Sequence, residues 1–127
     1  MSTDWVRPVD RAREELLAAR SLLDAGFPAQ ALSRAYSAGL QVATAALAVL
    51  GERPSTDAGV ISAFGRRVVG DGGLDHEVGR TLRQLYEDHY DVEYALLRAP
   101  EQEARKAIEG AELLVEAGAR WVEQRRG

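Results

Sequence analysis

One stretch of the sequence, residues 78–97, carries an apolar pattern that leaves little choice of fold. Its apolar residues are Val78, Leu82, Leu85, Val92 and Leu96. When position 89 is included, the steps between them alternate between four and three residues. This spacing forms one stripe along a helix, and such a stripe is buried against other helices. The residue in the middle of the stripe is His89, where leucine or isoleucine is expected. A titratable ring on a buried face needs a partner.

The same helical spacing recurs along the rest of the chain, and no segment alternates with the period of two that strands require. Prolines, glycines and capping residues divide the chain into predicted helices. The long ones cover residues 8–25, 28–50, 76–99 and 100–124, and a short one covers residues 58–69. The sequence therefore predicts an all-α fold, an up-and-down helical bundle of four long helices plus one short helix.

Two further features place these helices. The helix over residues 28–50 is rich in alanine, so neighbouring helices can approach it closely and it is expected to be central. We expect Ser55, Thr56 or Asp57 to cap the short helix and Asp75 to cap the helix that carries His89, because short oxygen-bearing side chains accept the free N–H groups of a first turn.

Composition excludes several classes of protein. The 127 residues suit one domain, and the absence of cysteine excludes disulfides and thiolate metal sites. With only two histidines, a histidine-rich metal site within one chain is not expected. No glycine-rich phosphate loop or zinc motif is present, and no cofactor is expected. The net charge of −4 argues against a broad nucleic-acid groove, which needs a basic face. No apolar run reaches the ~20 residues of a membrane span and the first residues do not form a signal peptide, so a cytoplasmic protein is expected.

His89 is the first candidate for chemistry. A histidine can accept the proton that leaves a 2′-hydroxyl of RNA, or supply the proton that reaches the leaving oxygen. Glu93, four residues later, can reach the ring and favour its charged form, whereas burial favours the neutral form. The alternative is a histidine that is hydrogen-bonded in the core or at a helix interface.

Arg83 is the second candidate, because a guanidinium can hold a phosphate with two parallel hydrogen bonds. It stands six residues before His89, which corresponds to ~9 Å along a helix and ~120° around it. The two side chains can therefore flank one phosphate only if the long arginine side chain bends inward or a second subunit completes the site. The alternative role of Arg83 is a surface salt bridge with Glu87.

Tyr86, Tyr90 and Tyr94 recur every four residues and form an aromatic ridge beside the apolar stripe. Such a ridge can stack the bases of RNA or of a nucleotide, or it can pack against a neighbouring helix. Arg34 and Tyr36, in the alanine-rich helix, are further candidates for binding a nucleotide or RNA. The acidic residues of the His89 helix could bind a divalent cation, but they are more typical of a solvated face.

Three segments resemble, in order and spacing, the signatures of the HEPN domain family. The matching residues are Ser33-Arg34-Ala35-Tyr36-Ser37-Ala38, then Ser55-Thr56-Asp57-Ala58-Gly59-Val60-Ile61-Ser62-Ala63-Phe64, and then Leu85-Tyr86-Glu87 with Asp91-Val92-Glu93-Tyr94. The resemblance extends over about residues 9–124, nearly the whole chain. It implies a single HEPN-like helical domain, residues 1–127, with its core in the matched range.

The resemblance also implies a homodimer and a partner. HEPN proteins are often encoded beside a small nucleotidyltransferase, and many such pairs look like toxin and antitoxin. Active members cut RNA without a metal, through an arginine and a histidine separated by a short spacer that begins with a polar residue. Arg83 and His89, with Gln84 first in the spacer, fit this pattern. The resemblance therefore implies catalytic roles for them, in a cleft that two subunits share.

Two other classes of function stay open. One is a non-catalytic module that docks a nucleotidyltransferase or holds a nucleotide through Arg34, Tyr36 and the tyrosine ridge. The other is a structural dimer whose polar core residues satisfy one another. The acidic balance of the chain slightly favours these two alternatives over RNA cleavage.

Overall fold

A computed structural model of the protein describes residues 6–94 and 99–126. Its elements are α1 (Val6–Asp24), α2 (Pro28–Val49), α3 (Asp57–Ala63), η1 (Phe64–Gly70), α4 (His76–Tyr94) and α5 (Glu101–Arg126). No strand occurs among the described residues. The prediction of an all-α bundle with four long helices and a short helical segment is confirmed. The predicted end of the His89 helix, near residue 98, lies outside the described residues.

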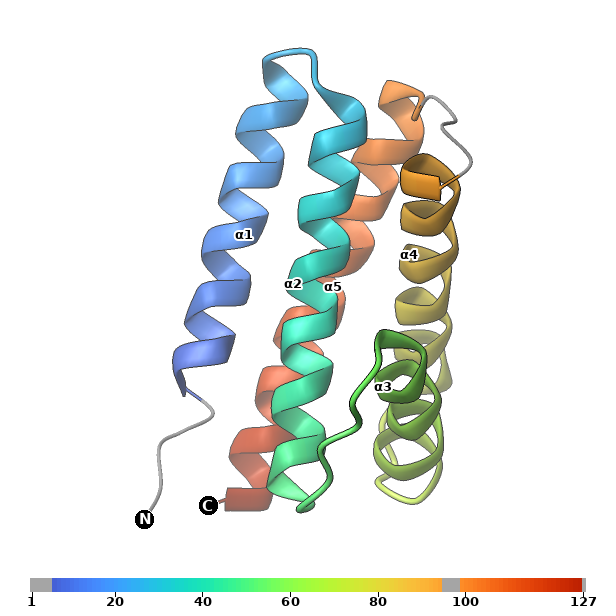
Figure 1. The fold of residues 1–127 in the computed structure, drawn as a ribbon. Coiled ribbons are helices and arrows are strands. Elements are labelled where there is room, and N and C mark those ends of the chain that lie inside the picture. The colour runs from blue at the N-terminus through green and yellow to red at the C-terminus, as the bar shows by residue number, and fades with distance from the viewer. Residues whose placement is uncertain (1–5, 95–98, 127) are drawn as a thin grey trace.

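The four long helices run alternately up and down, and α2 and α5 form the middle of the bundle (Figure 1). Both α1 and α4 pack against α2 and α5, while α1 and α4 do not touch each other within the described ranges. The short segment α3–η1 covers the lower part of the bundle beside α2 and α4 (Figure 1). Within the described residues, no helix is both long and apolar enough to cross a membrane.

Small residues let α2 occupy this central place. Its buried face is mostly alanine, and Gly39 faces side chains of both α4 and α5. A Cβ atom at Gly39 would lie 2.8 Å from the Leu114 side chain and 3.3 Å from that of Leu85. Gly118 of α5 has the same role against Val42, whose side chain would lie 2.9 Å from an added Cβ. The predicted central position of the alanine-rich helix is confirmed.

The short helix differs from its prediction in one respect. Residues 58–69 were expected to form one α-helix, but the turns widen after Ala63 and η1 is a π-helix. The wide turns of a π-helix are closed by bonds between residues five apart and are rare in proteins. Here they turn Phe64, Val68 and Val69 inward, and all three are buried. We infer that the burial of these three apolar side chains compensates for the loss of regular α-helical hydrogen bonds.

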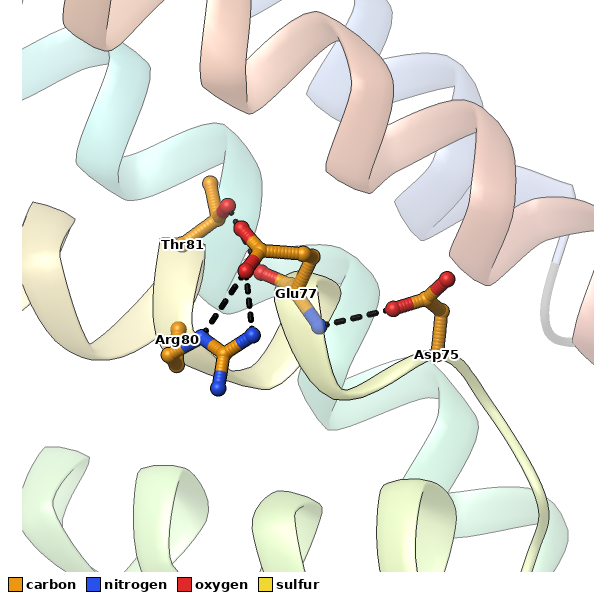
Figure 2. Close-up of polar contacts among 4 residues, drawn as sticks. All are labelled: Asp75, Glu77, Arg80 and Thr81. Atoms are coloured by element: carbon orange, nitrogen blue, oxygen red, sulfur yellow. Dashed lines mark hydrogen bonds and ion pairs between the residues drawn. The ribbon is translucent and has the colours of Figure 1, made fainter.

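Capping residues begin α3 and α4 as expected. The Thr56 hydroxyl accepts the Gly59 N–H at 3.0 Å, which settles which of three candidates caps α3. The Asp75 carboxylate accepts the Glu77 N–H at 2.9 Å (Figure 2). The first turn is tied further by the Arg80–Glu77 ion pair and by the Thr81 hydroxyl, which donates to the Glu77 carbonyl oxygen at 2.8 Å (Figure 2). These bonds fix where α4 begins, and they thereby fix the position of His89 along the helix.

Two bidentate ion pairs join α1 to α5. Arg13 donates two hydrogen bonds of 2.9 Å to Glu116, and Arg20 donates two bonds of 2.9 and 2.6 Å to Glu112. The hydrogen bond from Arg13 lowers the pKa of the Glu116 carboxyl below its ordinary value of 4.5, although partial burial opposes the shift. The same bonds raise the pKa of Arg13 and of Arg20.

Substituting alanine for Gly39 tests the close approach of α2, α4 and α5. The added Cβ would meet the Leu114 side chain at 2.8 Å, and we expect overpacking to lower the free energy of unfolding by about 1–3 kcal/mol. Urea denaturation measures the change. The control is Gly65→Ala, where no atom lies within 4 Å of the added Cβ. Equal effects of the two substitutions would contradict the packing described for Gly39.

Replacing Glu116 by glutamine tests the Arg13–Glu116 pair through its pH dependence. A lowered pKa in the folded state means that the carboxylate adds stability above the ordinary value of 4.5, and that this stability is lost as the pH falls through the folded-state pKa. The melting temperature of Glu116→Gln should lie below that of the wild type at neutral pH, and the difference should close in acid. Glu123→Gln, on the same helix, is the control. A difference that does not change with pH would refute the account.

Candidate functional site

His89 lies on the face of α4 that packs against α2. Its ring stacks on the ring of Tyr36, with centroids 4.4 Å apart and planes inclined by 22°. The side chain is partly buried. His89 therefore sits at an interface between two helices and keeps some access to solvent.

Tyr36 links this interface to α3. Its ring is buried, with 4% of its surface exposed, and its hydroxyl donates a hydrogen bond of 2.8 Å to the Asp57 carboxylate. Asp57 is the first residue of α3. The contacts from Asp57 through Tyr36 to His89 thus connect α3, α2 and α4. We call these three residues, together with Tyr86 and Tyr90, the His89 cluster.

The Nδ1 atom of His89 is buried and has no hydrogen-bond partner among the described residues. The expected partner, Glu93, is engaged elsewhere, because its carboxylate accepts the Ser33 hydroxyl at 3.0 Å. Antiparallel packing explains this choice. Ser33 stands one turn before Tyr36 on α2 and Glu93 one turn after His89 on α4, so the two contacts lie side by side between the helices.

The tyrosine ridge forms part of the same cluster. Tyr86 lies 6.1 Å from Tyr36 and 6.4 Å from Tyr90 between ring centroids, in tilted arrangements. Tyr86 is partly buried, and 51% of the Tyr90 surface is exposed. The side chain of Tyr94, the third predicted member of the ridge, lies outside the described residues. The described part of the ridge therefore leads from the buried Tyr36 to the surface.

Arg83 is exposed on α4, and it forms no ion pair or hydrogen bond with another described residue. The expected salt bridge with Glu87 is absent from the described contacts. Six residues of α-helix separate Arg83 from His89 by about 120° around the axis. His89 faces α2 while Arg83 faces solvent, so the two side chains leave the helix in different directions.

Arg34 is not part of the cluster. It is exposed and pairs with Glu15 of α1 at 3.3 Å. Two residues of α-helix turn a side chain by about 200°, so Arg34 and Tyr36 leave α2 on opposite sides. The structure therefore does not bring together the two residues of α2 that were predicted to bind a nucleotide.

Asp57 is the member of the cluster that sequence reasoning missed. From the sequence it was one of three adjacent candidates to cap the short helix and a member of the second family-like segment, and neither assignment connected it to Tyr36. Because Thr56 provides the cap, the Asp57 carboxylate is left to accept the Tyr36 hydroxyl. Several capping residues before one short helix could have signalled that one of them serves another purpose.

Other polar features lie away from the cluster. A surface hollow of about 1010 Å³ runs along α1 and is lined by Arg7, Arg11, Glu15 and Arg34, among others. Another, of about 420 Å³, lies between α4 and α5. Within residues 6–94 and 99–126, no group of three or more histidine, aspartate or glutamate side chains is arranged to hold a metal ion.

Replacing His89 by leucine tests whether the Nδ1 atom of the ring finds a hydrogen-bond partner within the chain. Leucine would complete the apolar stripe and remove a buried nitrogen that lacks a hydrogen bond, so the free energy of unfolding should rise by about 1 kcal/mol. Urea denaturation measures it. Leu82→Ala, on the same stripe, should cost about 2–5 kcal/mol and shows that the assay detects losses. A clear loss of stability in His89→Leu would mean that the histidine is a satisfied structural residue.

Comparison with known proteins places the chain in a family. The model of the HEPN domain matches residues 5–121. A candidate toxin of Methanocaldococcus jannaschii is 32% identical over 108 residues, which cover 85% of this chain and 81% of that protein. Residues 5–121 include all of α1 to α4 and most of α5.

Proposed function

The chain belongs to the HEPN family, and we propose that it acts as the toxin-type member of a two-protein system and cleaves RNA without a metal ion. The name of the Methanocaldococcus jannaschii relative supports the first part of the proposal. The second part is supported by Arg83 and His89 of α4, which have the spacing of the family's RNA-cleaving pair.

One observation carries the proposal: neither Arg83 nor His89 pairs with the glutamate that stands four residues after it. Glu87 and Glu93 stand four residues after them and could have held each in an ion pair. In the fold, Arg83 has no such partner among the described residues, and Glu93 bonds to Ser33. Other exposed arginines are also unpaired within the described residues. Arg83 differs from them because it lies on the same helix as His89, whose Nδ1 atom lacks a hydrogen bond.

The reaction that suits this pair is transfer of the phosphate within the RNA chain. The 2′-oxygen attacks the adjacent phosphorus, and the 5′-oxygen of the next nucleotide leaves, giving a 2′,3′-cyclic phosphate and a free 5′-hydroxyl. His89 accepts the proton of the attacking 2′-hydroxyl, and the imidazolium that results supplies a proton to the departing 5′-oxygen. Arg83 donates hydrogen bonds to the phosphate oxygens, where negative charge builds up.

A second copy of the chain completes the site in this proposal. Arg83 and His89 diverge on one helix, so a single chain does not present both to one phosphate. A symmetric homodimer places the same surface of two chains face to face. If that surface includes the edge of the α2–α4 interface, where the partly buried His89 ring keeps access to solvent, the Arg83 of one chain meets the His89 of the other.

The remaining parts of the proposal concern organisation and partners. Buried residues from all the helices, including α3 and η1, join one core, which supports a single domain over residues 1–127. We include a small nucleotidyltransferase as the partner, which follows from the family resemblance, and a cytoplasmic location, which was expected from the sequence.

A non-catalytic binding module is the second candidate function. The observation that favours it is the tyrosine ridge, where half-exposed Tyr90 continues the ring contacts of Tyr86 and Tyr36 to the surface. In this version the ridge stacks one base of a nucleotide or of RNA. Because Arg34 faces α1, it does not contribute to such a site.

The RNA-cleavage proposal is tested with purified protein and a labelled single-stranded RNA. Replacing His89 by alanine should lower the cleavage rate by about 10²–10⁴-fold, the usual contribution of a general acid or base. Arg83→Ala should lower it by about 10²-fold or more, because the phosphate loses its hydrogen bonds. Expression of the wild-type protein should arrest growth, and expression of either variant should not.

Arg80→Ala provides the matched control, since Arg80 is an exposed arginine on the same helix that pairs with Glu77. It should cleave RNA as the wild type does. If the wild-type protein neither cuts RNA nor slows growth, the RNA-cleavage proposal is wrong. Tight binding of a nucleotide that is lost in Tyr90→Ala would then favour the binding module.

A further inference from the structure

We propose that Tyr36 and Asp57 are positioning residues for His89: the Asp57 carboxylate fixes the tyrosine ring, and the tyrosine ring fixes the imidazole. This inference rests on the proposed function, because it concerns how the histidine of the proposed cleavage site is held. Neither Tyr36 nor Asp57 touches RNA in this account. Their effect on the reaction passes through the orientation of the His89 ring.

The imidazole needs such support. The last torsion angle of a histidine side chain has a broad distribution, so the ring must be oriented by its surroundings. In many sites a hydrogen bond to one ring nitrogen sets the orientation. Here Nδ1 has no partner within the described residues, and the closest ring contact is the Tyr36 face, with centroids 4.4 Å apart. Stacking on Tyr36 therefore orients the imidazole ring, as a hydrogen bond does in other sites.

Tyr36 is suited to this role because its own ring is held at both ends. The ring is buried in the core, and its hydroxyl is anchored on Asp57 at 2.8 Å. Asp57 belongs to α3, whose first turn is fixed by the Thr56 cap. The bond between the Ser33 hydroxyl and the Glu93 carboxylate, one turn along, keeps α2 and α4 in the register that the stack requires.

The test combines proton NMR of the histidine rings with cleavage kinetics. The chain contains two histidines, and His76, exposed at the start of α4, serves as the internal control. The variants are Tyr36→Phe, which keeps the ring but loses the hydroxyl, and Asp57→Ala, which loses the acceptor. Asp57→Asn keeps an oxygen that can accept the Tyr36 hydroxyl.

We expect the His89 ring resonances to move in Tyr36→Phe and in Asp57→Ala, while those of His76 stay in place. The rate constant kcat should fall about tenfold in both variants with KM unchanged, because a displaced catalytic ring slows the reaction without weakening RNA binding. The double variant should be no slower than either single one, since both changes break the same bond. Asp57→Asn should recover most of the rate lost in Asp57→Ala.

His89 resonances that stay in place in both Tyr36→Phe and Asp57→Ala would overturn the inference, whatever the kinetics show. Additive losses of rate in the double variant would also overturn it. If the resonances move as expected but the wild type does not cleave RNA, the proposed function fails and the positioning of the ring stands. The two proposals can therefore fail separately.

Discussion

The contact between His89 and Tyr36 is the interaction on which the account of this protein depends. It places a polar ring in the apolar stripe of α4, where leucine would pack without leaving a nitrogen unsatisfied. The fold accommodates the His89 ring by stacking it on Tyr36, whose hydroxyl is hydrogen-bonded to Asp57. One turn along, a hydrogen bond between Ser33 and Glu93 joins the same two helices. Local exceptions to good packing are concentrated at functional sites, and this exception identifies the cluster as the candidate site.

Close packing elsewhere makes the stack possible. Because α2 has small residues on its buried face, α4 and α5 approach it closely at Gly39. The α1–α5 ion pairs then hold the opposite side of the bundle, where Arg13 and Arg20 each bind a carboxylate through two bonds. The closely packed part of the protein thus surrounds α2, and the cluster lies at the junction of α2, α3 and α4.

The sequence predicts the bundle well because period, capping and breaker signals act locally. The stripe of α4, the Asp75 cap and the alanine-rich α2 could all be recognised from neighbouring residues. The cap, the helix α2 and the stripe from Val78 to Val92 are confirmed, while Leu96 lies outside the described residues. The site was harder to predict, because its contacts join residues far apart in the chain. Glu93 could reach His89 along one helix, yet it bonds to Ser33 across two, and nothing in the sequence connected Asp57 to Tyr36. The π-helical turn at Phe64 was missed for the same reason, since tertiary packing determines it.

Complementation between two inactive chains tests most directly whether His89 works with an arginine of a second copy. Arg83→Ala and His89→Ala chains are produced together, so that mixed dimers form. In a mixed dimer one cleft keeps both an arginine and a histidine, and random pairing should restore about a quarter of the wild-type cleavage rate. We expect recovery to that level, because the site takes its arginine from one chain and its histidine from the other. A mixture that stays as inactive as its separate components would contradict a site shared between two chains.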